Sequence, residues 1–159
     1  MLGLRFRGRH SESQRGQSAV EFALVIPIAL MVSMGIFDFA RMYFTVITIS
    51  NAAREGARAG SIRQCEDPAG VVANSIQYKI TQAATGVTID PADITVAYLE
   101  NDGITPLVSP QMGKRIKVDV SVDYIPLTPV VGQILLTFIG NTLTRTAETF
   151  IEQTNQTCV

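Results

Sequence analysis

The stretch RGQSAVEFALVIPIALMVSMGIFDFAR, residues 15–41, decides the fold. Between Phe22 and Phe37 it contains no charged residue, and extending it to Ala40 adds only Asp38. A helix of this extended length covers ~28 Å, which is just enough for a bilayer core of roughly 30 Å. Pro27 removes one main-chain hydrogen bond and should kink the helix. The sequence therefore predicts a kinked membrane helix with its apolar part at 22–40.

Charge is unevenly distributed around this apolar part. Residues 1–16 hold four arginines and one glutamate, whereas the rest of the chain has 9 basic and 13 acidic side chains. A basic segment before a span is typical of the cytoplasmic side, so we expect the head to lie outside. The net charge of -1 does not favour nucleic acid as a partner. A cleaved secretory signal is disfavoured, because SMG at 33–35 is a poor small-residue cleavage site.

The helical pattern continues beyond the apolar part. No turn signal interrupts it before residue 61, so we expect a single helix over residues 17–61, with residues 1–16 as a basic leader. Gly56 and Gly60 are four residues apart and allow another backbone to approach closely. Local packing is the default interpretation of these glycines, and contact with a partner helix is the alternative.

The remaining residues, 62–159, predict a small α+β head. A second helix is expected over 67–86, with Asp67 as its N-cap and Gly86 near its C-terminus. Strict alternation from Ile116 to Tyr124 predicts a strand with one buried face and one wet face. Further strands are expected at 92–100 and 141–152, and a short apolar helix or packed connection at 129–140. Together they predict a helix on a three- to four-stranded antiparallel sheet.

The side chains of the head do not suggest catalysis. The chain's one histidine, His10, is in the leader, so neither a nucleophile–histidine pair nor a zinc site is expected, and no cofactor or metal is predicted. Asp119 and Asp123 lie on the wet face of a strand, where solvated surface is the better interpretation. Cys65 and Cys158 are candidates for a disulfide if the head is extracytoplasmic, and two unpaired thiols are the alternative.

Residues 15–61 resemble the TadE-like family, which comprises minor pilins or pseudopilins of the tight-adherence (Flp/Tad) pilus machinery of bacteria. The residues that carry the resemblance lie on the long helix: Ala19, Val20, Glu21, Phe22, Ala23, Pro27, Asp38, Arg41, Asn51, Ala52, Ala53, Arg54, Glu55, Gly56, Ala57 and Arg58. Over residues 62–159 the resemblance is architectural only. It implies a pilin-like fold and a substrate of assembly enzymes, not an enzyme.

The resemblance also implies a maturation step. A membrane prepilin peptidase would cut after Gly16, so that Gln17 becomes the N-terminus and Glu21, followed by Phe22, the fifth residue. Glu21 could then neutralise the α-amine of a neighbouring subunit and set the helix register. The simpler alternative is that Glu21 lies near the helix N-terminus, where the helix dipole favours a carboxylate.

The resemblance places the chain in the bacterial inner membrane as a single-pass protein, from which it can enter a cell-surface pilus. Its implied partners are the membrane, a prepilin peptidase, other pilin or pseudopilin subunits and the inner-membrane proteins of Tad assembly. A different function is also compatible with these residues. The helix would then be only a tether for an unprocessed, extracytoplasmic binding module of the envelope. The mass of the membrane-extracted chain distinguishes the two.

Overall fold

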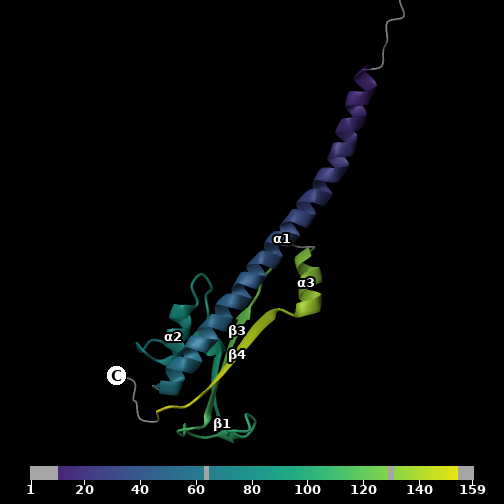
Figure 1. Ribbon diagram of the computed structural model, residues 1–159. Helices are drawn as coiled ribbons and strands as arrows, with labels where there is room; N and C mark the ends of the chain where they lie inside the picture. The colour runs from purple at the N-terminus through teal and green to yellow at the C-terminus, as the bar shows by residue number, and fades with distance from the viewer. Residues whose placement is uncertain (1–10, 63–64, 129–130, 154–159) are drawn as a thin grey trace, which may run out of the picture.

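One long helix dominates the molecule. The computed structural model describes residues 11–62, 65–128 and 131–153, without the side chains of residues 11–15, 131 and 135. Helix α1 spans Ser11–Ile62 and runs from a free N-terminal half into a small head (Figure 1). The predicted single helix is confirmed, but it begins six residues before Gln17. Glutamate, glutamine and arginine in this extension are good helix formers, and adding turns to an existing helix costs little.

The head consists of a sheet with short helices around it. All neighbouring strands are antiparallel, in the order β2-β1-β3-β4. This confirms the predicted α+β fold with a second helix and an antiparallel sheet. The elements after α1 are α2 (Ile76–Ala83), a 3-10 turn η1 (Pro91–Asp93), β1 (Ile94–Leu99), β2 (Pro106–Leu107), β3 (Arg115–Asp123), α3 (Val131–Ile139) and β4 (Thr142–Phe150).

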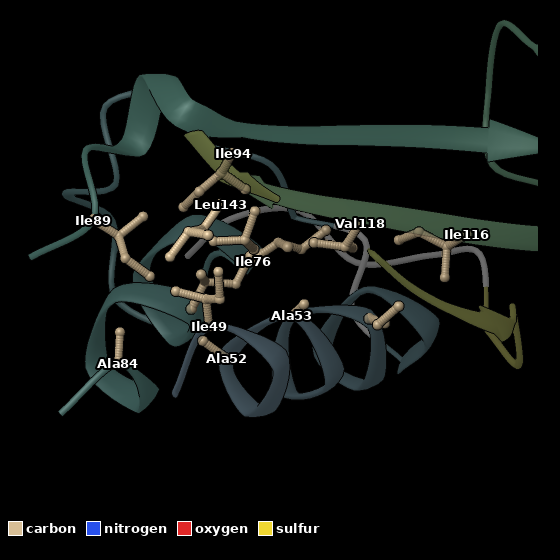
Figure 2. Packing of buried hydrophobic residues seen from close by; sticks show 14 of the residues in the cluster. Ile49, Ala52, Ala53, Ile76, Ala84, Ile89, Ile94, Ile116, Val118 and Leu143 are labelled. Carbon is tan, nitrogen blue, oxygen red and sulfur yellow. The ribbon is translucent and has the colours of Figure 1, made fainter. Parts of the chain in front are cut away.

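The core lies between the C-terminal half of α1 and one face of the sheet. Ile116, Val118 and Val120 on β3 are fully buried, as their alternation predicts. Small residues on α1, among them Ala52 and Ala53, are also fully buried against this face (Figure 2). Because alanine adds little volume, the helix axis can approach the sheet closely. This half of α1 is therefore an integral part of the core of the head.

The prediction for the second helix was wrong at its start. A helix over residues 67–86 with Asp67 as N-cap was expected, but α2 is limited to Ile76–Ala83. Its N-cap is Ser75, whose hydroxyl accepts a hydrogen bond from a main-chain N–H of the first turn. Gly86 has a positive φ, as a residue that ends a helix should, but it lies beyond the C-cap.

Local turn chemistry explains the shorter helix. The Asp67 carboxylate accepts hydrogen bonds at 2.7 Å from the main-chain N–H groups of both Val71 and Val72, which folds this segment into a turn. These bonds hold the pKa of the Asp67 carboxyl below its usual value, and the bond from Val72 has the largest effect. Gly70 and Asn74 have φ angles of 65° and 70°, and a right-handed helix cannot pass through such residues.

The apolar segment after β3 forms a helix, so the first of the two predicted alternatives is the observed one. Helix α3 (Val131–Ile139) lies beside α1 at the end of the head nearest the free half of α1 (Figure 1). It connects the end of β3 to the start of β4, since Asp123 pairs with Thr142 across the sheet. The opposite end of the sheet carries the β1–β2 loop.

Candidate functional site

The N-terminal half of α1 is an apolar rod that no part of the head covers. Every described residue from Gly16 to Phe37 is exposed except Gly35, which is half-buried. The helix from Gly16 is long and apolar enough to cross a membrane. Pro27 lies inside it, and Figure 1 shows that α1 bends gently between its free half and the half on the sheet. That Pro27 sets this bend stays a prediction.

The predicted cleavage position lies on the exposed surface of α1. A side chain at Gly16 would have no atom within 4 Å. The side-chain amide of the next residue, Gln17, donates a hydrogen bond of 3.2 Å to the carboxylate of Glu21, one turn further along the helix. Phe22 is also exposed, next to this pair. The structure thus brings Gln17 and Glu21 together on one face of the helix, with the carboxylate accessible to another chain.

Asp38, the one charge within the apolar part, is buried at the point where α1 meets the head. Its carboxylate accepts hydrogen bonds from the main-chain N–H groups of Leu127, at 2.9 Å, and Thr128, at 3.0 Å. The Thr128 hydroxyl donates a further bond to it. The Tyr124 hydroxyl donates to the main-chain carbonyl of Asp38 at 2.8 Å. We call these four residues the Asp38 clip, because they tie the β3–α3 loop to α1.

The clip also fixes the start of α3. The main-chain N–H of Gly132 donates to both the hydroxyl and the carbonyl of Thr128, at 3.0 and 3.1 Å. A Cβ at Gly132 would lie 2.7 Å from the Cγ of Pro126, so the turn into α3 is closely packed. Asp38 thus positions Thr128, which in turn accepts hydrogen bonds from a main-chain N–H in the first turn of α3. The Asp38 carboxylate thus links the long helix α1 to the loop that leads into α3.

The segment at 51–58 divides into a packed side and a charged side. Asn51, Arg54, Glu55 and Arg58 are exposed, as is Arg41, one turn beyond the clip. Gly56, in contrast, is buried. Arg54 and Arg58 line a shallow hollow whose other wall includes Glu148 and Glu152 at the end of the sheet. This charged side is available for contact with other molecules.

The two glycines of α1 pack against the head itself. A Cβ at Gly56 would overlap the side chain of Ile80 on α2. A Cβ at Gly60 would overlap Ile116 on β3 and lie 3.0 Å from the Cδ1 of Ile76. Local packing is therefore the observed role of both, and the partner-helix alternative is wrong for them, because their open side is already occupied.

Residues 16–58 match the TadE-like protein family. The match covers the rod, the Asp38 position and the segment at 51–58, and it confirms the resemblance noted in the sequence. No curated protein and no solved structure gives a significant match. This match relates residues 16–58 of the chain to a family associated with the Tad pilus. The chain's long apolar helix is compatible with membrane anchoring.

Sequence reasoning found Asp38 in the TadE-like region but missed its partners. The loop that binds it is 89 and 90 residues further along the chain, and nothing in the sequence around Leu127 and Thr128 marks it as a receptor for a carboxylate. One signal was nevertheless present. A charge in an apolar run is expensive to bury unless it is hydrogen-bonded, so Asp38 had to have partners somewhere.

The other candidate residues do not form a reactive site. Within the described ranges there is no group of three or more His, Cys, Asp or Glu side chains suited to a metal ion. Asp119 binds the Thr146 hydroxyl and lies 3.0 Å from the Lys117 ammonium, as expected of a strand's polar face. Cys65 is buried and is not a free thiol. Cys158 lies outside the described residues, so the pairing of these two cysteines stays a prediction.

Proposed function

We propose that the chain is a TadE-like minor pilin, or pseudopilin, that takes part in assembling a Flp/Tad-type pilus. The observation that carries this proposal is the uncovered rod of α1, which belongs to the TadE-like region. Side chains such as Phe22, Leu24 and Phe37 are each 66–70% exposed, so water is an unfavourable surrounding for them. Lipid covers them before assembly, and the helices of other pilin subunits replace the lipid during assembly.

Glu21 is the residue we assign to helix register. Cleavage after Gly16 would give Gln17 a cationic α-amine. The structure already places the Gln17 and Glu21 side chains in contact, at 3.2 Å. In a bundle of such helices, an amine from one subunit and the Glu21 carboxylate of the next neutralise each other. The attraction offsets the desolvation of both groups only when the pair is well aligned, and this requirement selects one axial register.

Processing would have to open the helix. The Gly16–Gln17 bond lies inside α1, which begins at Ser11, whereas a peptidase needs an accessible peptide bond. Glycine within a helix costs about 1 kcal/mol relative to alanine, so Gly16 weakens the helix at the position to be cut. We therefore assign Gly16 a second role, in the local unwinding that lets the prepilin peptidase reach this bond.

The proposed topology follows the charges. The basic leader stays in the cytoplasm, α1 crosses the inner membrane, and the head lies in the extracytoplasmic space, from which it can reach a cell-surface pilus. The predicted pairing of Cys65 with Cys158 is compatible with that compartment. The exposed charges Arg54, Glu55 and Arg58 would then face other subunits or Tad assembly proteins.

The mass of the membrane-extracted chain tests processing. Loss of residues 1–16 is the expected result, with Gln17 as the new N-terminus. A full-length chain would refute processing. A chain that begins near residue 35 would instead indicate a secretory signal and would contradict membrane anchoring. Expression in cells without the prepilin peptidase is the control, and there the full-length mass is expected.

Substitution of Glu21 tests the register. Glu21→Ala should abolish incorporation of the protein into filaments or pilus formation, while thermal unfolding of the head is unchanged, because the side chain is exposed and distant from the sheet. Asp93→Ala, which removes an exposed acidic residue of η1 that does not line the hollow at Arg54 and Arg58, is the matched control and should leave piliation normal. Normal piliation in Glu21→Ala would remove this residue from the mechanism.

One observation favours a second function, that of an unprocessed membrane-anchored binding module. The helix already runs through the cleavage position, from Ser11 onward, so the uncut chain is a regular structure. In this case the rod would remain a tether in lipid, and the charged side of α1 at Arg54 and Arg58 would bind the module's partner. A full-length mass together with normal piliation in Glu21→Ala would select this function.

A further inference from the structure

The end of the head nearest the rod carries an apolar surface. Residues 124–144 contain no charged side chain, and α3 lies within this segment. Phe138 is 84% exposed, and the loop before α3 adds Ile125 at 79% and Leu127 at 70%. We call Ile125, Leu127, Ile134, Phe138 and Ile139 the α3 patch, and all five are exposed. Exposed apolar side chains of this number on a small domain indicate an interaction surface.

Aromatic residues on α1 lie at a similar level along the molecule. Phe39, Tyr43 and Phe44 are 54–57% exposed, and the rings of Phe39 and Tyr43 stack with their centroids 6.5 Å apart. Figure 1 shows α3 alongside the section of α1 where the helix leaves the head. Tyrosine, the residue at position 43, is enriched together with tryptophan where a membrane protein crosses the headgroup layer. The patch therefore continues the apolar surface of the rod onto the head.

The length of the rod sets the depth of this region. The charge-free run from Phe22 to Phe37 covers only about 24 Å of a hydrocarbon core of roughly 30 Å. If Glu21 marks the cytoplasmic boundary of the core, the outer boundary falls roughly one turn beyond Phe37, at the level of Asp38 and Arg41. The Asp38 clip binds Leu127 at this level, so the loop before α3 is brought to the membrane surface.

We propose that the α3 patch is seated in the headgroup layer of the outer leaflet, so that the head is held against the lipid surface and does not stand clear of it. The clip explains how a carboxylate is tolerated there, because Asp38 is buried and hydrogen-bonded within the protein. Arg41 is exposed one turn further on, where its guanidinium can reach lipid phosphates while its stem lies along apolar surface. The inference depends on membrane anchoring by α1, and neither cleavage nor pilus assembly is required for it.

A lipid surface fits the patch better than a second copy of the chain does. The segment that holds the patch, residues 124–144, contains no charged side chain, whereas a protein interface usually has a polar rim. Its side chains also come from a loop and a short helix beside the long apolar helix, so the loop before α3 lies at the level of Asp38.

The absence of tryptophan from the chain makes a direct test possible. Phe138→Trp places one reporter in the patch at an exposed position. Ile104→Trp is the matched control, because Ile104 is 81% exposed in the β1–β2 loop at the opposite end of the sheet. Ile28→Trp, in the rod, reports whether α1 is in the bilayer. Each full-length variant is reconstituted into vesicles of phosphatidylcholine and phosphatidylglycerol, with and without brominated acyl chains.

The expected result is a blue-shifted emission for Phe138→Trp that brominated lipids quench about twofold or more, as for a side chain at the headgroup–acyl boundary. Ile28→Trp should be quenched more strongly and Ile104→Trp not at all. Adding Asp38→Asn should weaken quenching at position 138 but not at position 28, because an amide cannot accept all the bonds of the clip.

Three outcomes would overturn the proposal. The first is an unquenched Phe138→Trp beside a quenched Ile28→Trp, which would show a head that stands clear of the bilayer. The second is a blue shift at position 138 that disappears when the protein is diluted in lipid, which would assign the patch to contact between copies. The third is an unquenched Ile28→Trp, which would remove membrane anchoring and with it this inference. The first two outcomes contradict the headgroup position of the α3 patch but leave the proposed pilin function intact. A failure of this inference can therefore be distinguished from a failure of the proposed function.

Discussion

Replacing Asp38 by alanine should detach the β3–α3 loop from α1. The carboxylate accepts three hydrogen bonds, two from the main-chain N–H groups of Leu127 and Thr128 and one from the Thr128 hydroxyl. A hydrogen bond to a charged group contributes about 1.5–3 kcal/mol, and contributions within one network are not additive. We therefore expect a loss of about 4 kcal/mol, similar to the breaking of a buried charged pair.

Two measurements check this loss. For a chain of this size about 4 kcal/mol corresponds to a fall of roughly 12 °C in the thermal midpoint, measured on the full-length protein in detergent from the near-ultraviolet circular dichroism of its tyrosines. If the loop opens without unfolding the sheet, the loss appears instead in amide hydrogen exchange. The Leu127 and Thr128 amides should then exchange about 100-fold faster or more, since each 1.4 kcal/mol is a factor of ten.

Two further variants make the result interpretable. Asp123→Ala is the matched control, because the Asp123 carboxylate accepts one bond of 2.8 Å from Thr142 on an exposed strand, and its removal should cost under about 1 kcal/mol. Tyr124→Phe removes one neutral hydrogen bond to the Asp38 carbonyl and should cost about 1 kcal/mol. A midpoint for Asp38→Ala within about 2 °C of wild type, with unchanged exchange at Leu127, would refute the clip.

Two other predictions concern the packing of α1 and the acid sensitivity of a turn. Gly60→Ala should lower stability by about 1–3 kcal/mol, because its Cβ overlaps Ile116, whereas Gly16→Ala, with open space around it, should cause no loss of stability. Asp102 accepts bonds from the Thr105 hydroxyl and from the main-chain N–H groups of Ile104 and Thr105, which lower its pKa from 3.8 to about 2. Because the pKa is depressed in the folded state, the contribution of Asp102 is complete well above pH 3.8 and is lost as the pH falls towards 2. The difference in unfolding free energy between wild type and Asp102→Asn should shrink over that window, and a difference that does not depend on pH would contradict this assignment.

Periodicity in the sequence was sufficient to predict the main elements. The alternation from Ile116 to Tyr124 gave both a strand and its buried face, since a period of two has one structural solution. The long helix was also predictable, because no turn signal occurs before residue 61. Pro27 is a helix breaker, but the residues after it continue the helical pattern. These features depend on neighbours along the chain, and such neighbours are visible in a single sequence.

The failures have a different physical origin. The start of α2 was misplaced because Asp67 can cap either a helix or a turn, and the choice depends on Gly70 and Asn74, whose positive φ angles only the structure reveals. The partners of Asp38 were missed because they are contacts between distant segments. Likewise, the four-residue spacing of Gly56 and Gly60 could not show which side chains pack against them, because this spacing allows a close approach by a partner helix or by the head itself.

The sharing of α1 between the anchor and the head has a mechanical consequence. The same unbroken helix contributes the uncovered rod and the buried residues Ala52 and Ala53, so no slack linker separates the two parts. A force along the rod is therefore transmitted directly to the core of the head. A rotation of the rod about its axis also rotates the charged side at Arg54 and Arg58. A movement of the free half of α1 would therefore be transmitted directly to a molecule bound at Arg54 and Arg58.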